Sequence, residues 1–120
     1  MIRHIKHPSL VESAGTMDKK IYEYFGRVNS NTDEVSIAHM KSPQGWIEPE
    51  QTPKFNEYTV VLKGTLKIEN EDNVFLVKEG EAILTGKDES VRYSTPFEGG
   101  AEYIAICLPA FSPYLVNRNQ

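Results

Sequence analysis

Apolar and polar residues alternate in short stretches through most of the chain, with turn-forming residues between the stretches. Alternation over four to eight residues is typical of strands that bury one face. The expected strands cover residues 21–25, 35–40, 57–62, 65–68, 74–77, 81–84, 91–94 and 102–108. Helical periodicity is weak, and only residues 112–116 are expected to form a turn of helix.

Turn signals set the spacing of these strands. Lys63-Gly64 predicts a tight turn between two strands, and the polar run at 70–73 predicts another. Many short strands at regular spacing indicate a sandwich or a closed barrel. The sequence therefore predicts an all-β protein, with residues 1–19 as an N-terminal arm and residues 20–120 as a single domain.

Composition narrows the classes of partner. The chain has 120 residues, which suits one domain, and its net charge of -4 argues against a nucleic-acid partner. No stretch has the apolar length that crosses a bilayer, and the N-terminus lacks the apolar core of a signal peptide. The single cysteine, Cys107, lies in an apolar run and is expected to be buried. We therefore expect no membrane partner and a reducing, cytoplasmic location.

One segment carries a family signature. Gly45, Glu57 and Gly64 have the spacing of a motif that reads Gly, five residues, His-x-His, three or four residues, Glu, six residues, Gly. Gln51 and Pro53 stand where that motif has its two histidines. The segment resembles the first motif of the cupin family.

The second cupin motif is fainter. Of its residues only Gly80 matches, and Val91 stands at its histidine position, but the rhythm of strands and turns agrees. The resemblance covers roughly residues 35–108 and implies a cupin-type double-stranded β-helix, or jelly-roll barrel. It suggests a small single-domain bacterial cupin with degenerate metal-binding motifs. The family includes dioxygenases, isomerases, epimerases, lyases, sugar-binding regulators and storage proteins, so membership does not fix the reaction.

The resemblance also implies a site inside the barrel. Cupin metals are usually held by three histidines and one carboxylate, and Glu57 is the one ligand position that this chain retains. The facing of strand 35–40 is open: either 35, 37 and 39 point inward, or 36, 38 and 40 do. If His39 points inward, it can join Glu57 and Gln51 around one divalent metal ion (Fe, Ni, Mn or Zn). It can equally act with Glu57 in acid–base catalysis without a metal.

Four residues are candidates for ligand binding. Glu48 and Gln51 lie in a proline-flanked loop at the expected barrel mouth, and Trp46 and Tyr93 can shape the pocket. Burial of the Glu57 carboxyl in an apolar barrel is expected to raise its pKa, which suits proton transfer near neutral pH.

Three functions remain open from the sequence. The first is a cupin that binds or converts a small polar metabolite, either a sugar derivative or a small carboxylate. The second is a metal-dependent isomerase, epimerase, lyase or oxygenase with an atypical site around Glu57. The third is a non-catalytic structural or accessory barrel. A homodimer is expected, because exposed sheet edges invite pairing.

Overall fold

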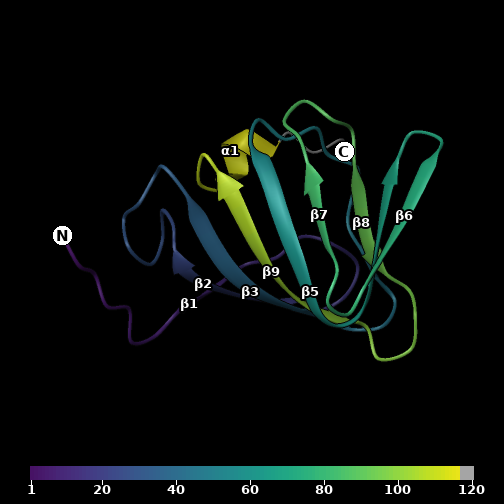
Figure 1. Ribbon diagram of the computed structural model, residues 1–120, viewed down its shortest axis with the longest axis horizontal. Coiled ribbons are helices and arrows are strands. Elements are labelled where there is room, and N and C mark those ends of the chain that lie inside the picture. The colour runs from purple at the N-terminus through teal and green to yellow at the C-terminus, as the bar shows by residue number, and fades with distance from the viewer. Residues whose placement is uncertain (117–120) are drawn as a thin grey trace.

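The computed structural model describes residues 1–116, in which nearly all regular structure is β-sheet (Figure 1). The strands are β1 (Ser9–Val11), β2 (Lys20–Phe25), β3 (Ser36–Ser42), β4 (Trp46–Ile47), β5 (Asn56–Asn70), β6 (Asn73–Lys78), β7 (Ala82–Thr85), β8 (Arg92–Thr95) and β9 (Ala101–Leu108). One short helix, α1 (Pro113–Val116), follows β9. The all-β prediction is confirmed, and residues 117–120 of the predicted domain lie outside the described residues.

The long strand β5 connects two parts of a curled sheet. The path of hydrogen-bonded neighbours is β1-β2-β3-β9-β5-β8-β4, and β6 and β7 also pair with β5. The first half of β5 pairs with β9 and β7, and its second half pairs with β6 and β8. In Figure 1, β2, β3, β9 and β5 lie side by side, and the sheet curls toward β7, β8 and β6.

The predicted turn at Lys63-Gly64 is wrong. The chain continues through both residues as strand β5, and the register against β9 shifts between Val61 and Lys63. Gly64 has a φ of 76°, and a Cβ at this position would collide with the Gly100 carbonyl oxygen. Gly64 therefore allows β5 to bend from one part of the sheet into the other while it stays close to the start of β9.

Alternation along the strands decides which side chains reach the interior. In β9, Tyr103, Ala105 and Cys107 are buried, and the residues between them are more exposed. The same rule buries Glu57 and Thr59 of β5. Two apolar clusters form inside, and they comprise Trp46, Val61, Leu66, Ile68, Val77, Val91, Tyr93, Ala101 and Tyr103 in the first, and Phe55, Cys107 and Val116 in the second.

The predicted N-terminal arm is attached to the sheet. Its strand β1 pairs with β2, with Ser9 opposite Glu23. Farther along, the Ala14 carbonyl accepts a hydrogen bond from the Trp46 Nε1–H at 2.9 Å. The backbone N–H of Thr16 donates to the Ile47 carbonyl, also at 2.9 Å. Residues 12–18, which we call the strap, therefore lie against β4.

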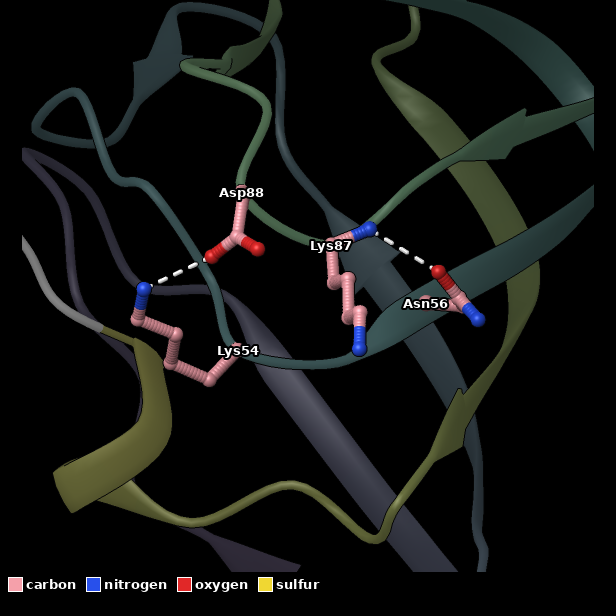
Figure 2. A network of polar contacts seen from close by, with 4 residues as sticks. All are labelled: Lys54, Asn56, Lys87 and Asp88. Carbon is pink, nitrogen blue, oxygen red and sulfur yellow. Dashed lines mark hydrogen bonds and ion pairs between the residues drawn. The ribbon is translucent and has the colours of Figure 1, made fainter.

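A small polar network holds the loop between β7 and β8 against the start of β5 (Figure 2). Lys54 Nζ and Asp88 Oδ1 lie 2.7 Å apart, and the backbone N–H of Lys87 donates to Asn56 Oδ1 at 2.8 Å. The hydrogen bond and the positive charge of Lys54 lower the pKa of Asp88. This network fixes the loop next to the strand end that carries Glu57.

No helix among residues 1–116 is long and apolar enough to span a bilayer.

Candidate functional site

A cavity lies inside the curled sheet and has about 60 Å³ of room for the centres of water molecules. Both apolar clusters contribute to its wall, the first through Tyr93 and the second through Phe55, Cys107 and Val116. The strap contributes Glu12 and Ala14. Polar side chains from several elements also line it, and they are Lys19, Glu23, Ser36, Glu48, Gln51 and Glu57.

Glu57 is the carboxylate of β5 that faces the cavity. It lies opposite Cys107 of β9 and Thr85 of β7 in the sheet register, and 8% of its surface is exposed. Burial and the negative charge of Glu48 raise the pKa of Glu57 to about 7, although the Lys19 charge and a hydrogen bond with the Cys107 thiol act in the opposite direction. A carboxyl with this pKa is half protonated at neutral pH and can both donate and accept a proton.

Lys19 is a buried cation at the same site. Lys19 is the last residue before β2, and only 7% of it is exposed. Nζ lies 4.0 Å from the centroid of the Trp46 ring system and 5.2 Å from the Tyr103 ring. Burial lowers the pKa of Lys19, but Tyr103, Glu48 and Glu57 together outweigh burial, and the net direction is upward. Lys19 is therefore an ammonium ion that partly balances the carboxylates.

Gln51 presents an acceptor to the cavity. Its backbone forms an isolated bridge with Val91, with N–O distances of 2.9 and 2.8 Å. Its side chain lines the cavity, 4% of the residue is exposed, and Oε1 has no hydrogen-bond partner among the described residues. A buried amide oxygen without a partner costs free energy, so a ligand that donates a hydrogen bond here would gain affinity.

Tyr93 and Cys107 complete the polar wall. Tyr93 Oη lies 2.6 Å from Thr85 Oγ1. Burial and the charge of Glu57 raise the pKa of both the Tyr93 phenol and the Cys107 thiol well above their ordinary values. Both groups therefore keep their protons at neutral pH and serve as donors rather than as nucleophiles.

Solved structures with the same arrangement of strands decide the fold. An RmlC-like cupin from Shewanella frigidimarina superposes with a TM-score of 0.71 over 90% of this chain and 89% of that protein, at 12% identity. The polyketide cyclase RemF from Streptomyces resistomycificus gives 0.75 over 100% and 87%, at 18% identity. The chain has the cupin fold. A predicted oxalate decarboxylase from Thermotoga maritima also superposes on this cupin barrel, with a TM-score of 0.71 over 91% and 99% at 16% identity.

The sequence comparisons are sparser. No family model matches the chain. Endoribonuclease YbeY from Myxococcus xanthus is 37% identical over 99 residues, which are 82% of this chain. The chain spans about a third of the length of that curated relative, 34%. The solved structures carry varied functions, so the fold alone does not choose among them.

The structure brings four of the six predicted site residues to the cavity. Glu48, Gln51, Glu57 and Tyr93 all line it. Trp46 does not line the cavity. It is 1% exposed, its Nε1–H donates a hydrogen bond to the strap, and its ring makes a cation–π contact with Lys19 Nζ. The prediction that Trp46 contacts ligand therefore has no support in the geometry.

His39 lies on the other face of its strand. Ser36, Ala38 and Met40 of β3 line the cavity, which resolves the facing that the sequence left open. His39 Nε2 lies 2.8 Å from Glu102 Oε1 instead, and it is absent from the cavity wall. It cannot share a metal ion or a proton with Glu57 in this arrangement, because the sheet lies between them.

The residues in the cavity do not fit the metal that most cupin barrels hold. The histidine positions carry Gln51, Pro53 and Val91, and His39 faces away. Across residues 1–116, no three His, Cys, Asp or Glu side chains lie close enough together to hold a metal ion. Lys19 places an ammonium charge beside Glu48 and Glu57, where it competes with a cationic metal for the same carboxylates.

Sequence reasoning missed Lys19 and underrated Cys107. Lys19 lies at the end of the predicted arm, and no motif or spacing marks a lysine there as buried. Cys107 was expected to be a buried apolar residue, and it is buried. Its contact with Glu57 depends on the register between β5 and β9, which the alternation of single strands does not reveal.

Proposed function

We propose that this protein is a cupin that binds a small polar metabolite in its barrel pocket and converts it by proton transfer at Glu57. The observation that carries the proposal is a buried carboxyl with a pKa of about 7 in the wall of a cavity. Beside it, the buried Gln51 Oε1 lacks a hydrogen-bond partner among the described residues. The interior of a purely structural barrel would be packed with apolar side chains, because a buried carboxyl and an unpaired amide oxygen both destabilise the fold.

The chemistry assigned to Glu57 is general acid–base catalysis. At neutral pH the carboxylate form accepts a proton from bound substrate, and the protonated form returns it at another atom. Tyr93 and Cys107 hold their own protons; the Cys107 thiol hydrogen-bonds Glu57, and the Tyr93 hydroxyl pairs with Thr85. Lys19 stabilises the carboxylate form, so the negative charge that Glu57 regains when it returns the proton is not isolated.

The lining also ranks the two ligand classes suggested by the sequence. Gln51 Oε1 and the carboxylates are acceptors, so they favour a ligand rich in hydroxyl or other donor groups. Among sugar derivatives, a cavity with about 60 Å³ of room for water centres suits only the smallest. A small carboxylate meets repulsion from Glu48 and Glu57. The proposed ligand is therefore compact, polar and rich in hydrogen-bond donors.

The test is a ligand-observed NMR screen of sugar derivatives and small hydroxy acids against the full chain. Compounds that bind the wild type should lose binding with Glu57→Gln and keep it with Glu79→Gln, the same change at an exposed turn. Compounds that bind should then be followed for chemical change over time. Ligands that bind equally to Glu57→Gln and wild type would refute the role of this pocket.

The match to Endoribonuclease YbeY favours a second candidate, an accessory barrel that works with an RNA-cleaving enzyme. The matched segment is about a third of that protein, 34%, which is consistent with a barrel joined to another functional unit. The net charge of -4 makes RNA an unfavourable direct ligand of the barrel, so its partner would be protein. Co-purification of the tagged chain with an endoribonuclease from its own cells, with nuclease-treated lysate as the control, would support this candidate; its absence would count against it.

A further inference from the structure

The charges around the cavity are unbalanced. Within the described part of the chain, its wall contains the carboxylates of Glu12, Glu23, Glu48 and Glu57 and one ammonium, that of Lys19. The Glu23 carboxylate already has partners in the fold, because its Oε2 accepts hydrogen bonds from two backbone N–H groups of the turn after β2, both at 2.9 Å. Glu12 is exposed to solvent, so Glu48 and Glu57 remain as the two buried carboxylates beside the one ammonium.

The single cation is already engaged. Lys19 Nζ lies over the Trp46 ring at 4.0 Å and near the Tyr103 ring at 5.2 Å, and its side chain hydrogen-bonds Tyr103. These contacts hold the ammonium against aromatic faces that attract cations. Lys19 is therefore held in place, and it supplies one positive charge against the two buried carboxylates Glu48 and Glu57.

Gln51 is independent evidence for the kind of ligand that the cavity binds. Its Oε1 is buried, lines the cavity and lacks a hydrogen-bond partner among the described residues. An amide oxygen only accepts, so the missing partner is a donor. The rest of the wall is apolar and includes Ile21, Phe55 and Phe111, which suits a short hydrocarbon segment next to the donor.

We propose that the pocket binds the ammonium group of a compact primary amine, with Glu48 and Glu57 supplying the negative charge and Gln51 Oε1 accepting one of its hydrogen bonds. This inference rests on the proposed function and narrows it to one class of ligand. The room for water centres, about 60 Å³, corresponds to about four water-sized groups, which is the size of a three-carbon amine.

Binding of an ammonium depends on the ionisation of Glu57. Because the pKa of Glu57 is about 7, its carboxylate form predominates at pH 8 and its neutral form at pH 6. Amine affinity should therefore fall as the pH is lowered across this range. The titratable groups that surround Glu57 are Lys19 before β2, Glu23 of β2, Glu48 after β4, Tyr93 of β8 and Cys107 of β9.

The experiment compares three probes of equal length, propylammonium, propan-1-ol and propionate, at equal ionic strength and pH 8. The readout is the NMR signals of the Gln51 side-chain amide and of pocket backbone amides in the ¹⁵N-labelled full chain. Propylammonium should bind about tenfold more tightly than propan-1-ol, since one charge-assisted hydrogen bond exceeds a neutral one by roughly 1.4 kcal/mol. Propionate should leave the signals unmoved.

Variants separate this inference from general pocket binding. Glu57→Gln should bring the affinities for propylammonium and propan-1-ol close together, and Gln51→Met should weaken propylammonium, while Glu79→Gln should behave as wild type. Propan-1-ol or propionate binding as tightly as propylammonium would overturn the ammonium assignment and leave the small-molecule pocket standing. Pocket signals that move with none of the three probes would overturn both.

Discussion

Replacement of Glu57 by glutamine should change how the stability of the protein depends on pH. The glutamine side chain has nearly the same shape and never ionises. Burial and Glu48 raise the pKa of Glu57 from 4.5 to about 7 in the folded protein. Ionising this buried carboxyl therefore costs the folded state about 3 kcal/mol relative to the unfolded chain.

The sign follows from proton counting. Below pH 4.5 both states hold the Glu57 proton, so the group does not affect stability. Between pH 4.5 and 7 the unfolded chain has released the proton and the folded protein has kept it, so the free energy of unfolding falls as the pH rises. Above pH 7 both states are ionised and this contribution is constant. Ionisation of Glu57 thus costs the folded protein nothing at acidic pH, and the full cost is reached once the pH has risen through about 7.

The assay is urea unfolding of wild type and Glu57→Gln at pH values from 4 to 8. The free energy of unfolding of the variant minus that of wild type should increase by about 3 kcal/mol between the two ends of the range, mostly between pH 5 and 7. Glu79→Gln, at an exposed turn, should show no such trend. A difference between Glu57→Gln and wild type that stays constant with pH would refute the argument that this carboxyl is desolvated.

Three further predictions concern other parts of the molecule. Lys19→Met should lower the free energy of unfolding at pH 8 by about 3 kcal/mol, because it leaves buried carboxylates without their counter-charge, and the loss should shrink in the Glu57→Gln background. Wild-type protein should be a dimer by light scattering at micromolar concentration, and Val60→Lys on the exposed apolar outer face of β5 should be a monomer; a monomeric wild type would contradict this. Elemental analysis of untagged protein should find iron, nickel, manganese and zinc each well below one atom per chain, and a stoichiometric metal lost in Glu57→Gln would contradict the electrostatic role given to Lys19.

Much of the fold follows from the sequence because strand alternation is a local property. The predicted strands at 21–25, 35–40, 74–77 and 102–108 correspond to β2, β3, β6 and β9. The two-residue strand β4 was missed, since a pair of residues has no periodicity to detect. The turn at Lys63-Gly64 was wrong for a different reason. Glycine permits a tight turn and also permits a bend inside a strand, and only the packing against Gly100 selects the bend.

The site was predictable only where spacing fixed it. Glu57 and Tyr93 point into the barrel because each lies at an inward position of its strand, and alternation passes that information along the strand. The facing of His39 was ambiguous because a shift of one residue reverses every side chain of a strand. The two alternating faces of β3 do not differ markedly in apolar character. The burial of Lys19 could not be predicted from the sequence, because it depends on aromatic rings that come together only when the strap folds over β4.

The central claim is that the Glu57 carboxyl is desolvated inside the cavity and is half ionised at neutral pH. The most direct measurement is a ¹³C NMR titration of the side-chain carboxyl carbons of glutamate-labelled protein, with the Glu57 signal assigned by its absence in Glu57→Gln. The account predicts a midpoint of about 7 for this signal. A midpoint near 4.5, the ordinary value for a glutamate, would contradict it.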